Sequence, residues 1–129
     1  MSRSSDPVPA EQAPGRPLLP WGLAVVGGHS MEPTLRPGDR VLVRYGAPVR
    51  AGDLVLVDLP PGPDGPRPLA VKRAVRREPG GGWWVASDNA AHGTDSRTLG
   101  ALPASAVRAR VVLRLPRWVR LGAASSPDR

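Results

Sequence analysis

Hydrophobic residues occur along this chain in short runs that are separated by turns rich in glycine and proline. The first run, Trp21 to Val26, ends at a Gly-Gly pair. Two similar units follow, GDRVLV from Gly38 and GDLVLV from Gly52, and each is a Gly-Asp turn before valine and leucine. Such runs favour β-strands. We therefore predict three strands here, and we expect the strands of the two similar units to be neighbours.

The second half of the chain predicts three more strands. The runs at 69–76 and 83–87 are joined by a short Gly-rich turn, so they are expected to form a hairpin, and 106–114 is expected to be the last strand. We expect a turn or a single helical turn at 31–35 and a polar loop at 88–100, since no segment has a convincing helical period. The predicted fold class is mainly β, with short strands in a small barrel-like arrangement.

The length of 129 residues suggests one domain. We predict disordered tails at 1–17 and 122–129, because they are rich in proline or in small polar residues, and a folded domain at 18–121. The most apolar early run, Leu18 to Gly28, is interrupted by Pro20 and is shorter than the roughly 20 residues of a membrane span. We therefore expect a soluble, cytoplasmic protein.

The net charge of +7 is carried almost entirely by arginine, since Lys72 is the only lysine among 18 basic residues. This charge would suit nucleic acid or an anionic membrane surface, but we favour an arginine-rich background composition of the encoding genome as its source. Four Trp, one Tyr and no Phe are few aromatics for stacking bases, so a nucleic-acid-binding β domain is an alternative that we do not favour. With no cysteine and two histidines, we expect no metal site and no cofactor.

Two residues are candidates for chemistry. Ser30 follows two glycines, which allow close approach of a backbone whose N–H groups can stabilise an oxyanion. Extended alternation would turn His29 away from it. A serine nucleophile needs a base, and a buried lysine can lose its proton where arginine cannot. Alternation places Lys72 between Ala70 and Ala74, whose small side chains are expected to leave room for the serine and a substrate.

A Ser–His–Asp hydrolase is an alternative use of the same serine. His92 would be the base, with Asp88 or Asp95 as its partner. The G-x-S-x-G pattern of a nucleophile elbow does not surround Ser30, so we favour this alternative less.

Four segments resemble, in order, the conserved boxes of the type I signal peptidase family. They are GHSMEPTLRPGDRVLV, GDLVLV, VKRAV and SDNAAHGTDSRTLG, and together they extend over most of the chain from Val25 to Gly100. The resemblance implies a serine endopeptidase with a Ser–Lys dyad on a mainly β fold. Ser30 would be the nucleophile, Lys72 the general base, and the Ser30 backbone N–H one oxyanion donor.

The last box of the resemblance implies residues that support the site. Asp88 and Asn89 match its Asp-Asn pair, and Asp95 and Arg97 match a structural salt bridge.

Three positions depart from the family pattern. Gly28 stands where many relatives have a serine whose hydroxyl assists the oxyanion, and Ser87 stands where the last box usually opens with glycine. Gly93 stands where a serine usually lies near the lysine amine, so Thr94 or a water is expected to replace that contact.

The chain shows neither the membrane anchor nor the large inserted domain of the family. It therefore resembles the short, anchor-free branch of nickel-type superoxide dismutase maturation proteases. This implies a protein precursor as partner, a nickel superoxide dismutase whose N-terminal propeptide is removed. The alternative is a general signal peptidase held peripherally at a membrane by the basic segment from Arg108 to Arg120.

The substrate is expected to bind as an extended strand. It would pair with Val25, Val26 and Gly27 before the serine, and with Ala70 and Val71 before the lysine. Small residues next to the cleaved bond should be preferred.

Overall fold

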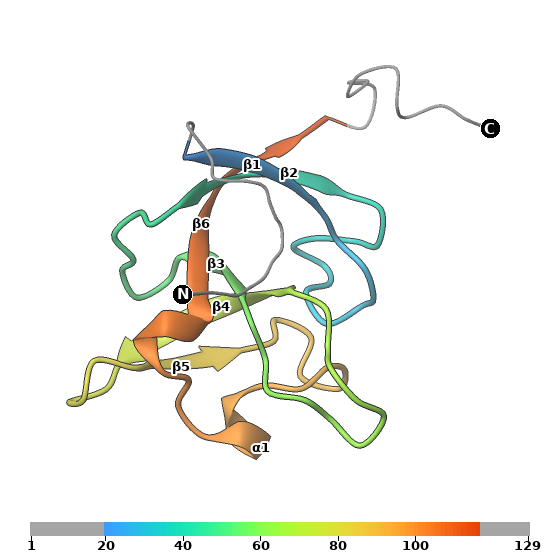
Figure 1. The fold of residues 1–129 in the computed structure, drawn as a ribbon. Helices are drawn as coiled ribbons and strands as arrows, with labels where there is room; N and C mark the ends of the chain where they lie inside the picture. The colour runs from blue at the N-terminus through green and yellow to red at the C-terminus, as the bar shows by residue number, and fades with distance from the viewer. Residues whose placement is uncertain (1–19, 117–129) are drawn as a thin grey trace.

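The computed structural model describes residues 20–116, so the predicted tails at 1–17 and 122–129 lie outside the described residues. This part of the chain is built almost entirely of strands, with two single-turn helical segments (Figure 1). The elements are β1 (Trp21–Val25), β2 (Arg40–Tyr45), β3 (Leu54–Val57), β4 (Ala70–Arg77), β5 (Trp83–Ala86), α1 (Ser96–Leu99), the 3-10 turn η2 (Ala104–Ala106) and β6 (Val107–Leu115).

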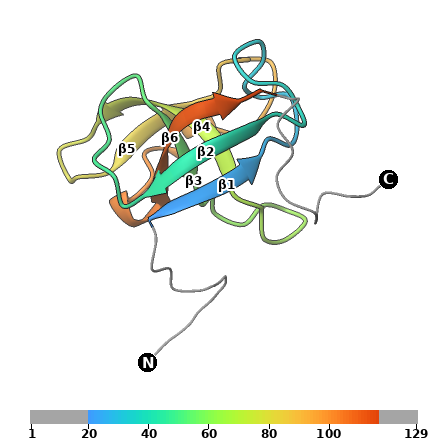
Figure 2. The same cartoon turned by 90° about the horizontal axis from the view of Figure 1, so that it is seen from above.

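The six strands form one antiparallel sheet in the order β1-β2-β6-β3-β4-β5. The mainly β prediction is confirmed, and so is the hairpin of β4 and β5. The sheet is strongly curved but not closed, because within residues 20–116 its outer strands β1 and β5 are not paired with each other (Figure 2). The barrel-like outline is therefore an open sheet.

The expectation that the two Gly-Asp strands are neighbours was wrong. They became β2 and β3, and β6 lies between them and pairs with both. β6 has nine residues, and the overlap at Ala109 and Arg110 lets one strand join the β1–β2 pair to the β3–β4–β5 group (Figure 1). Similar local sequences predict similar strands, but they do not predict the order of those strands in the sheet.

The sheet has a hydrophobic core on each face. Alternation along β3 sends Val55 and Val57 to one core and Leu56 to the other, and β4 likewise sends Val71 to one and Ala74 to the other. The first core contains Val26, Met31, Leu35, Val41, Val43, Leu56, Val71 and Ala109. The second contains Val55, Val57, Leu59, Ala74, Trp83, Val85 and Leu102.

The short helix α1 lies inside the segment that was expected to be a polar loop. The carboxylate of Asp95 caps its first turn by accepting a hydrogen bond from the Arg97 N–H, and Gly100, at φ 77°, ends it. A four-residue helix is too short to show a hydrophobic period. The Asp at the start and the Gly at the end of DSRTLG are typical helix-capping residues, and they could have indicated this helix.

Candidate active site

Ser30 lies in an irregular turn that begins directly after β1. The strand ends at Val25, and Gly28 takes a φ of 75°, a left-handed conformation that favours glycine. The sequence analysis assumed that the backbone is extended up to Ser30, so that His29 points away from it. That assumption was wrong, because the extended strand ends before His29. His29 nevertheless pairs with Glu32, at 3.0 Å from Nδ1 to Oε2.

The turn of Ser30 is held by the segment that follows β5. The Asn89 N–H donates to the Ser30 carbonyl at 2.8 Å, and the Asn89 side-chain amide donates to the His29 carbonyl at 3.1 Å. Met31 is buried in the first core, and its sulfur accepts the Asp88 N–H at 3.4 Å. Two segments far apart in sequence thus fix the position of the serine.

Lys72 reaches this turn from β4. Its side chain is 2% exposed, and its Nζ donates to Ser30 Oγ at 3.2 Å and to Ser87 Oγ at 3.0 Å. The structure therefore brings the two main candidates of the sequence into hydrogen-bonding contact. It also brings in Ser87, whose contact with the lysine the sequence analysis missed.

The environment of Lys72 favours its neutral form. Burial lowers the pKa of the amine below its usual value of 10.5, because an ammonium group loses hydration there. The carboxylate of Asp95 opposes this by stabilising the ammonium, but burial has the larger effect. The amine can therefore act as a base at a lower pH than an exposed lysine.

Asp95 connects this site to α1. One of its oxygens accepts the Ser87 N–H at 2.9 Å, and the other accepts both the N–H and the Nε of Arg97, at 3.0 and 3.1 Å. Burial alone would raise the pKa of Asp95, yet these hydrogen bonds hold it below its usual value. Asp95 is thus a buried carboxylate that stays charged because it is fully hydrogen-bonded.

Asp88 is engaged on the opposite side of β4. It forms an ion pair with Arg73 at 2.6 Å and accepts the Thr34 hydroxyl at 2.6 Å, and the contact with Arg73 is the main reason why its pKa is lowered. Both carboxylates that a Ser–His–Asp arrangement would need are therefore bound to other groups. Within residues 20–116, no hydrogen bond joins the His92 side chain to Ser30, and its ring lies 6.0 Å from that of His29.

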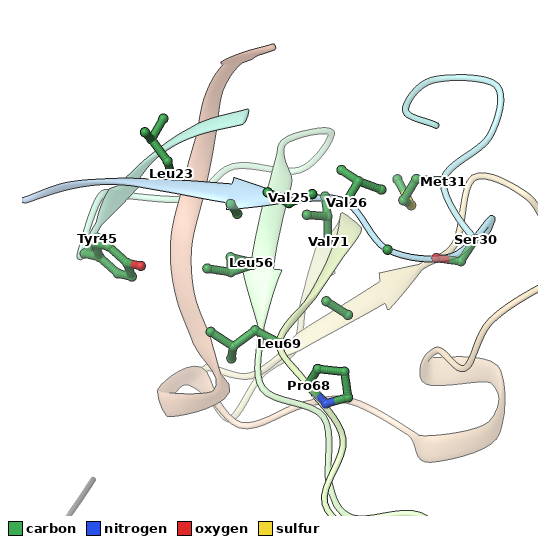
Figure 3. Close-up of a pocket in the computed structure, with 13 residues that line it drawn as sticks. Leu23, Val25, Val26, Ser30, Met31, Tyr45, Leu56, Pro68, Leu69 and Val71 are labelled. Atoms are coloured by element: carbon green, nitrogen blue, oxygen red, sulfur yellow. The ribbon is translucent and has the colours of Figure 1, made fainter. Parts of the chain in front are cut away.

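A cavity of about 370 Å³ begins at the serine. Ser30 lies at one end of it and Tyr45 at the other, with Leu56 between them (Figure 3). All five residues expected to pair with a substrate strand line it: Val25, Val26, Gly27, Ala70 and Val71. The expectation for Ala74 was wrong, because it is 0% exposed in the second core and leaves no space for a substrate.

Within residues 20–116, two strand edges that border this cavity have no strand partner. β1 is the outermost strand of the sheet, and β5 pairs with β4 only from Arg73 onward, so the β4 residues Ala70 and Val71 have no β5 partner. The geometry therefore leaves backbone groups on both sides of the cavity for an extended peptide.

Gly93 has no side chain and packs against Ser30, Lys72 and Ser87. A Cβ at this position would overlap with the Cβ of Ser30, and it would lie 2.9 Å from Lys72 Nζ and 3.0 Å from Ser87 Oγ. Thr94, which was expected to contact the lysine, comes next in the chain and is half-buried. The hydroxyls that accept hydrogen bonds from Lys72 are those of Ser30 and Ser87.

Gly93→Ala should damage the site beyond the cost of its backbone conformation. Gly93 has a φ of 84°, and Gly81 has a φ of 94° with open space around its Cβ position, so Gly81→Ala is a matched control. We expect about 1–2 kcal/mol of destabilisation in the control, from the left-handed backbone alone. We expect a clearly larger loss in Gly93→Ala, measured by urea unfolding. Equal losses in the two variants would contradict the close packing.

Lys72→Met should reveal the cost of burying the amine. The pKa of Lys72 is lower in the folded than in the unfolded protein, so unfolding takes up a proton between the lowered value and 10.5. The wild type should therefore gain stability relative to Lys72→Met as pH rises through that window, and the difference should be constant below it. Urea unfolding of both proteins from about pH 6 to about pH 10 measures this. Parallel curves would show that the pKa is not lowered.

A known protein family matches more than half of this chain. The family described as Peptidase S24-like matches residues 19–101, which include Ser30, Lys72 and every residue that lines the cavity. The mitochondrial inner membrane protease subunit 1 of Xenopus tropicalis is 28% identical over 116 residues, which cover 72% of this chain and 68% of that protein.

Residues 20–116 contain no helix that is long and apolar enough to cross a membrane. The family match covers more than half of the chain and the whole surroundings of the cavity. This chain therefore belongs to the Peptidase S24-like family.

Proposed function

We propose that this peptidase is a serine endopeptidase in which Ser30 is the nucleophile and Lys72 is the general base. The observation that carries the proposal is the 3.2 Å separation between the buried Lys72 Nζ and Ser30 Oγ, at the end of a cavity between two unpaired strand edges. A nucleophile within hydrogen-bonding reach of a base with a lowered pKa is the arrangement that acyl transfer requires.

The reaction follows from this geometry. The neutral amine of Lys72 takes the hydroxyl proton as Ser30 Oγ attacks the peptide carbonyl, and the ammonium then gives that proton to the departing amine. Water, deprotonated by the same lysine, then attacks the acyl-enzyme, and the ammonium returns this proton to Ser30 Oγ as the acid product leaves. The Ser30 N–H, which donates no hydrogen bond within the described residues, is our candidate for an oxyanion donor, and the left-handed turn at Gly28 lies beside it.

The substrate would lie extended in the cavity. The edge of β1 and the start of β4 offer backbone groups on either side of it, and Ala70 is the smallest side chain on its β4 border. The lining side chains are almost all apolar, so short apolar residues on the acyl side of the cleaved bond suit it.

The precursor of a nickel superoxide dismutase is the proposed substrate. This choice is supported by the resemblance of the sequence boxes to those of maturation proteases of that enzyme. Removal of a propeptide would free a new N-terminal amine, which an uncleaved precursor cannot offer to a metal.

Lys72→Arg should be as inactive as Lys72→Ala, although it keeps the positive charge. A general base must release its proton, and arginine does not do so in a protein. Ser30→Ala should be equally inactive, and the double variant Ser30→Ala/Lys72→Ala no worse than either single, because the two residues act as a unit. Cleavage of the precursor by each folded variant, followed by mass spectrometry, measures this.

The control for that experiment is His92→Ala, which should cleave at the wild-type rate. Substantial cleavage by Lys72→Arg would refute the Ser–Lys dyad, and loss of cleavage in His92→Ala would favour histidine as the base. A precursor left intact by a wild type that cleaves other peptides at small residues would refute the substrate and keep the dyad.

A general signal peptidase that works at a membrane surface is the second candidate. Large apolar side chains are exposed beside the cavity, among them Leu23 at 51%, Val25 at 68% and Leu69 at 45%. The relative from Xenopus tropicalis is by its name an inner membrane protease. Sedimentation of the chain with anionic phospholipid vesicles tests this candidate, and a chain that stays in the supernatant excludes it.

A further inference from the structure

We propose that Ser87 is a positioning residue that aims the Lys72 amine at Ser30, an inference that rests on the proposed Ser–Lys function. The inference concerns a hydroxyl that does not react itself. Its effect would be to select, from the rotations open to the amine, the one in which the lone pair faces the nucleophile.

The need for such a residue follows from the chemistry of an amine. A neutral lysine has two N–H donors and one lone pair, and only the lone pair can accept the hydroxyl proton of Ser30. If an N–H pointed at Ser30 instead, the amine would be within 3.2 Å of the hydroxyl and still unable to act. An acceptor elsewhere that holds one N–H removes this orientation. Ser87 Oγ, 3.0 Å from Nζ, is such an acceptor.

Ser87 is itself held in place. Its side chain is buried, and its N–H is fixed by the Asp95 carboxylate at 2.9 Å, which Arg97 holds in turn. The hydroxyl therefore lies at the end of a chain of hydrogen bonds that begins at α1. A group so constrained loses little entropy when it orients a neighbour.

The Lys72 amine leaves no room for a side chain at Gly93, which packs against it. Any Cβ at Gly93 would come within 3.0 Å of both Lys72 Nζ and Ser87 Oγ. The hydrogen bond between Lys72 and Ser87 and the absence of a side chain at Gly93 thus belong together, because a Cβ at Gly93 would press against both atoms of that bond.

A positioning role and a purely structural role for Ser87 predict different effects on the pKa of Lys72. The hydroxyl oxygen stabilises an ammonium more than an amine, since the charged group is the stronger donor. Removing it should therefore lower the pKa of Lys72 further. Loss of an ordinary buried serine would change stability and leave this pKa alone. The nearby charges are common to both cases: Asp95 acts on the amine electrostatically, and Asp88 is paired with Arg73.

The sequence makes this pKa directly measurable. Lys72 is the only lysine, so protein labelled with ¹³C at lysine Cε gives one lysine side-chain signal, whose pH titration needs no substrate. We would compare wild type with Ser87→Ala and with Ser96→Ala. Ser96 is the matched control, a buried serine whose hydroxyl accepts the Val85 N–H at 2.9 Å and does not contact the lysine.

The Lys72 signal should titrate at a lower pH in Ser87→Ala than in the wild type, whereas in Ser96→Ala it should titrate at the wild-type pH. In cleavage assays, Ser87→Ala should lose about 10- to 100-fold in kcat, as expected when a reacting group is misoriented, with KM little changed. Ser87→Thr, which keeps the hydroxyl, should recover most of the rate. If Ser87→Ala does not fold, Ser87→Cys offers a similar volume with a weaker acceptor and gives the same readout.

The inference is overturned if kcat is unchanged, or if the pKa of Lys72 in Ser87→Ala is equal to or above that of the wild type. Ser30→Ala separates this failure from failure of the proposed function. Should Ser30→Ala be inactive while Ser87→Ala behaves as wild type, the dyad stands and the positioning role falls. Should Ser30→Ala still cleave, the proposed function itself falls.

Discussion

The burial of one amine is the constraint on which the rest of this structure depends. Lys72 comes from the middle of a strand that packs against core on both faces, and it is nearly inaccessible to water. Burial favours the neutral amine, and it would leave an uncompensated charge whenever the amine is protonated. Asp95 reduces that cost without forming a direct ion pair, because its oxygens are held by Ser87 and Arg97. A direct pair would keep the lysine charged.

The site is assembled from three segments that the sheet order brings together. The turn after β1 supplies the serine, β4 supplies the lysine, and the segment from β5 to α1 supplies Ser87, Asn89 and Asp95. β1 and β4 are separated by three strands in the sheet, so only its curvature lets them border one cavity (Figures 1 and 3). β6 pairs with β2 along one edge and with β3 along the other, and so joins the two halves of the sheet.

The hydrophobic pattern predicted the strands closely, because each is a short run bounded by Gly, Pro or Asp. It did not predict that β6 separates β2 from β3, since strand order depends on contacts between residues far apart in sequence. Strand alternation correctly placed Ala74 on the same face of β4 as Lys72. It did not predict how deeply Ala74 is buried, and this residue lies in the second core. Ser87 was noted as an unusual residue at its position. Its contact with the lysine depends on how β4 and the segment after β5 pack together, which sequence spacing does not express.

Because the single lysine is buried and the other Lys/Arg residues are all arginine, the protonation of Lys72 can change without a change in the charge of the other basic side chains. Every other basic side chain apart from the two histidines is arginine, which stays protonated throughout the range in which a buried amine titrates. The positive charge of these arginines therefore stays constant while the Lys72 amine loses its proton. A protein with many exposed lysines would lose part of its positive potential over the same range. Here the charge of the arginine side chains and the protonation of Lys72 can vary independently.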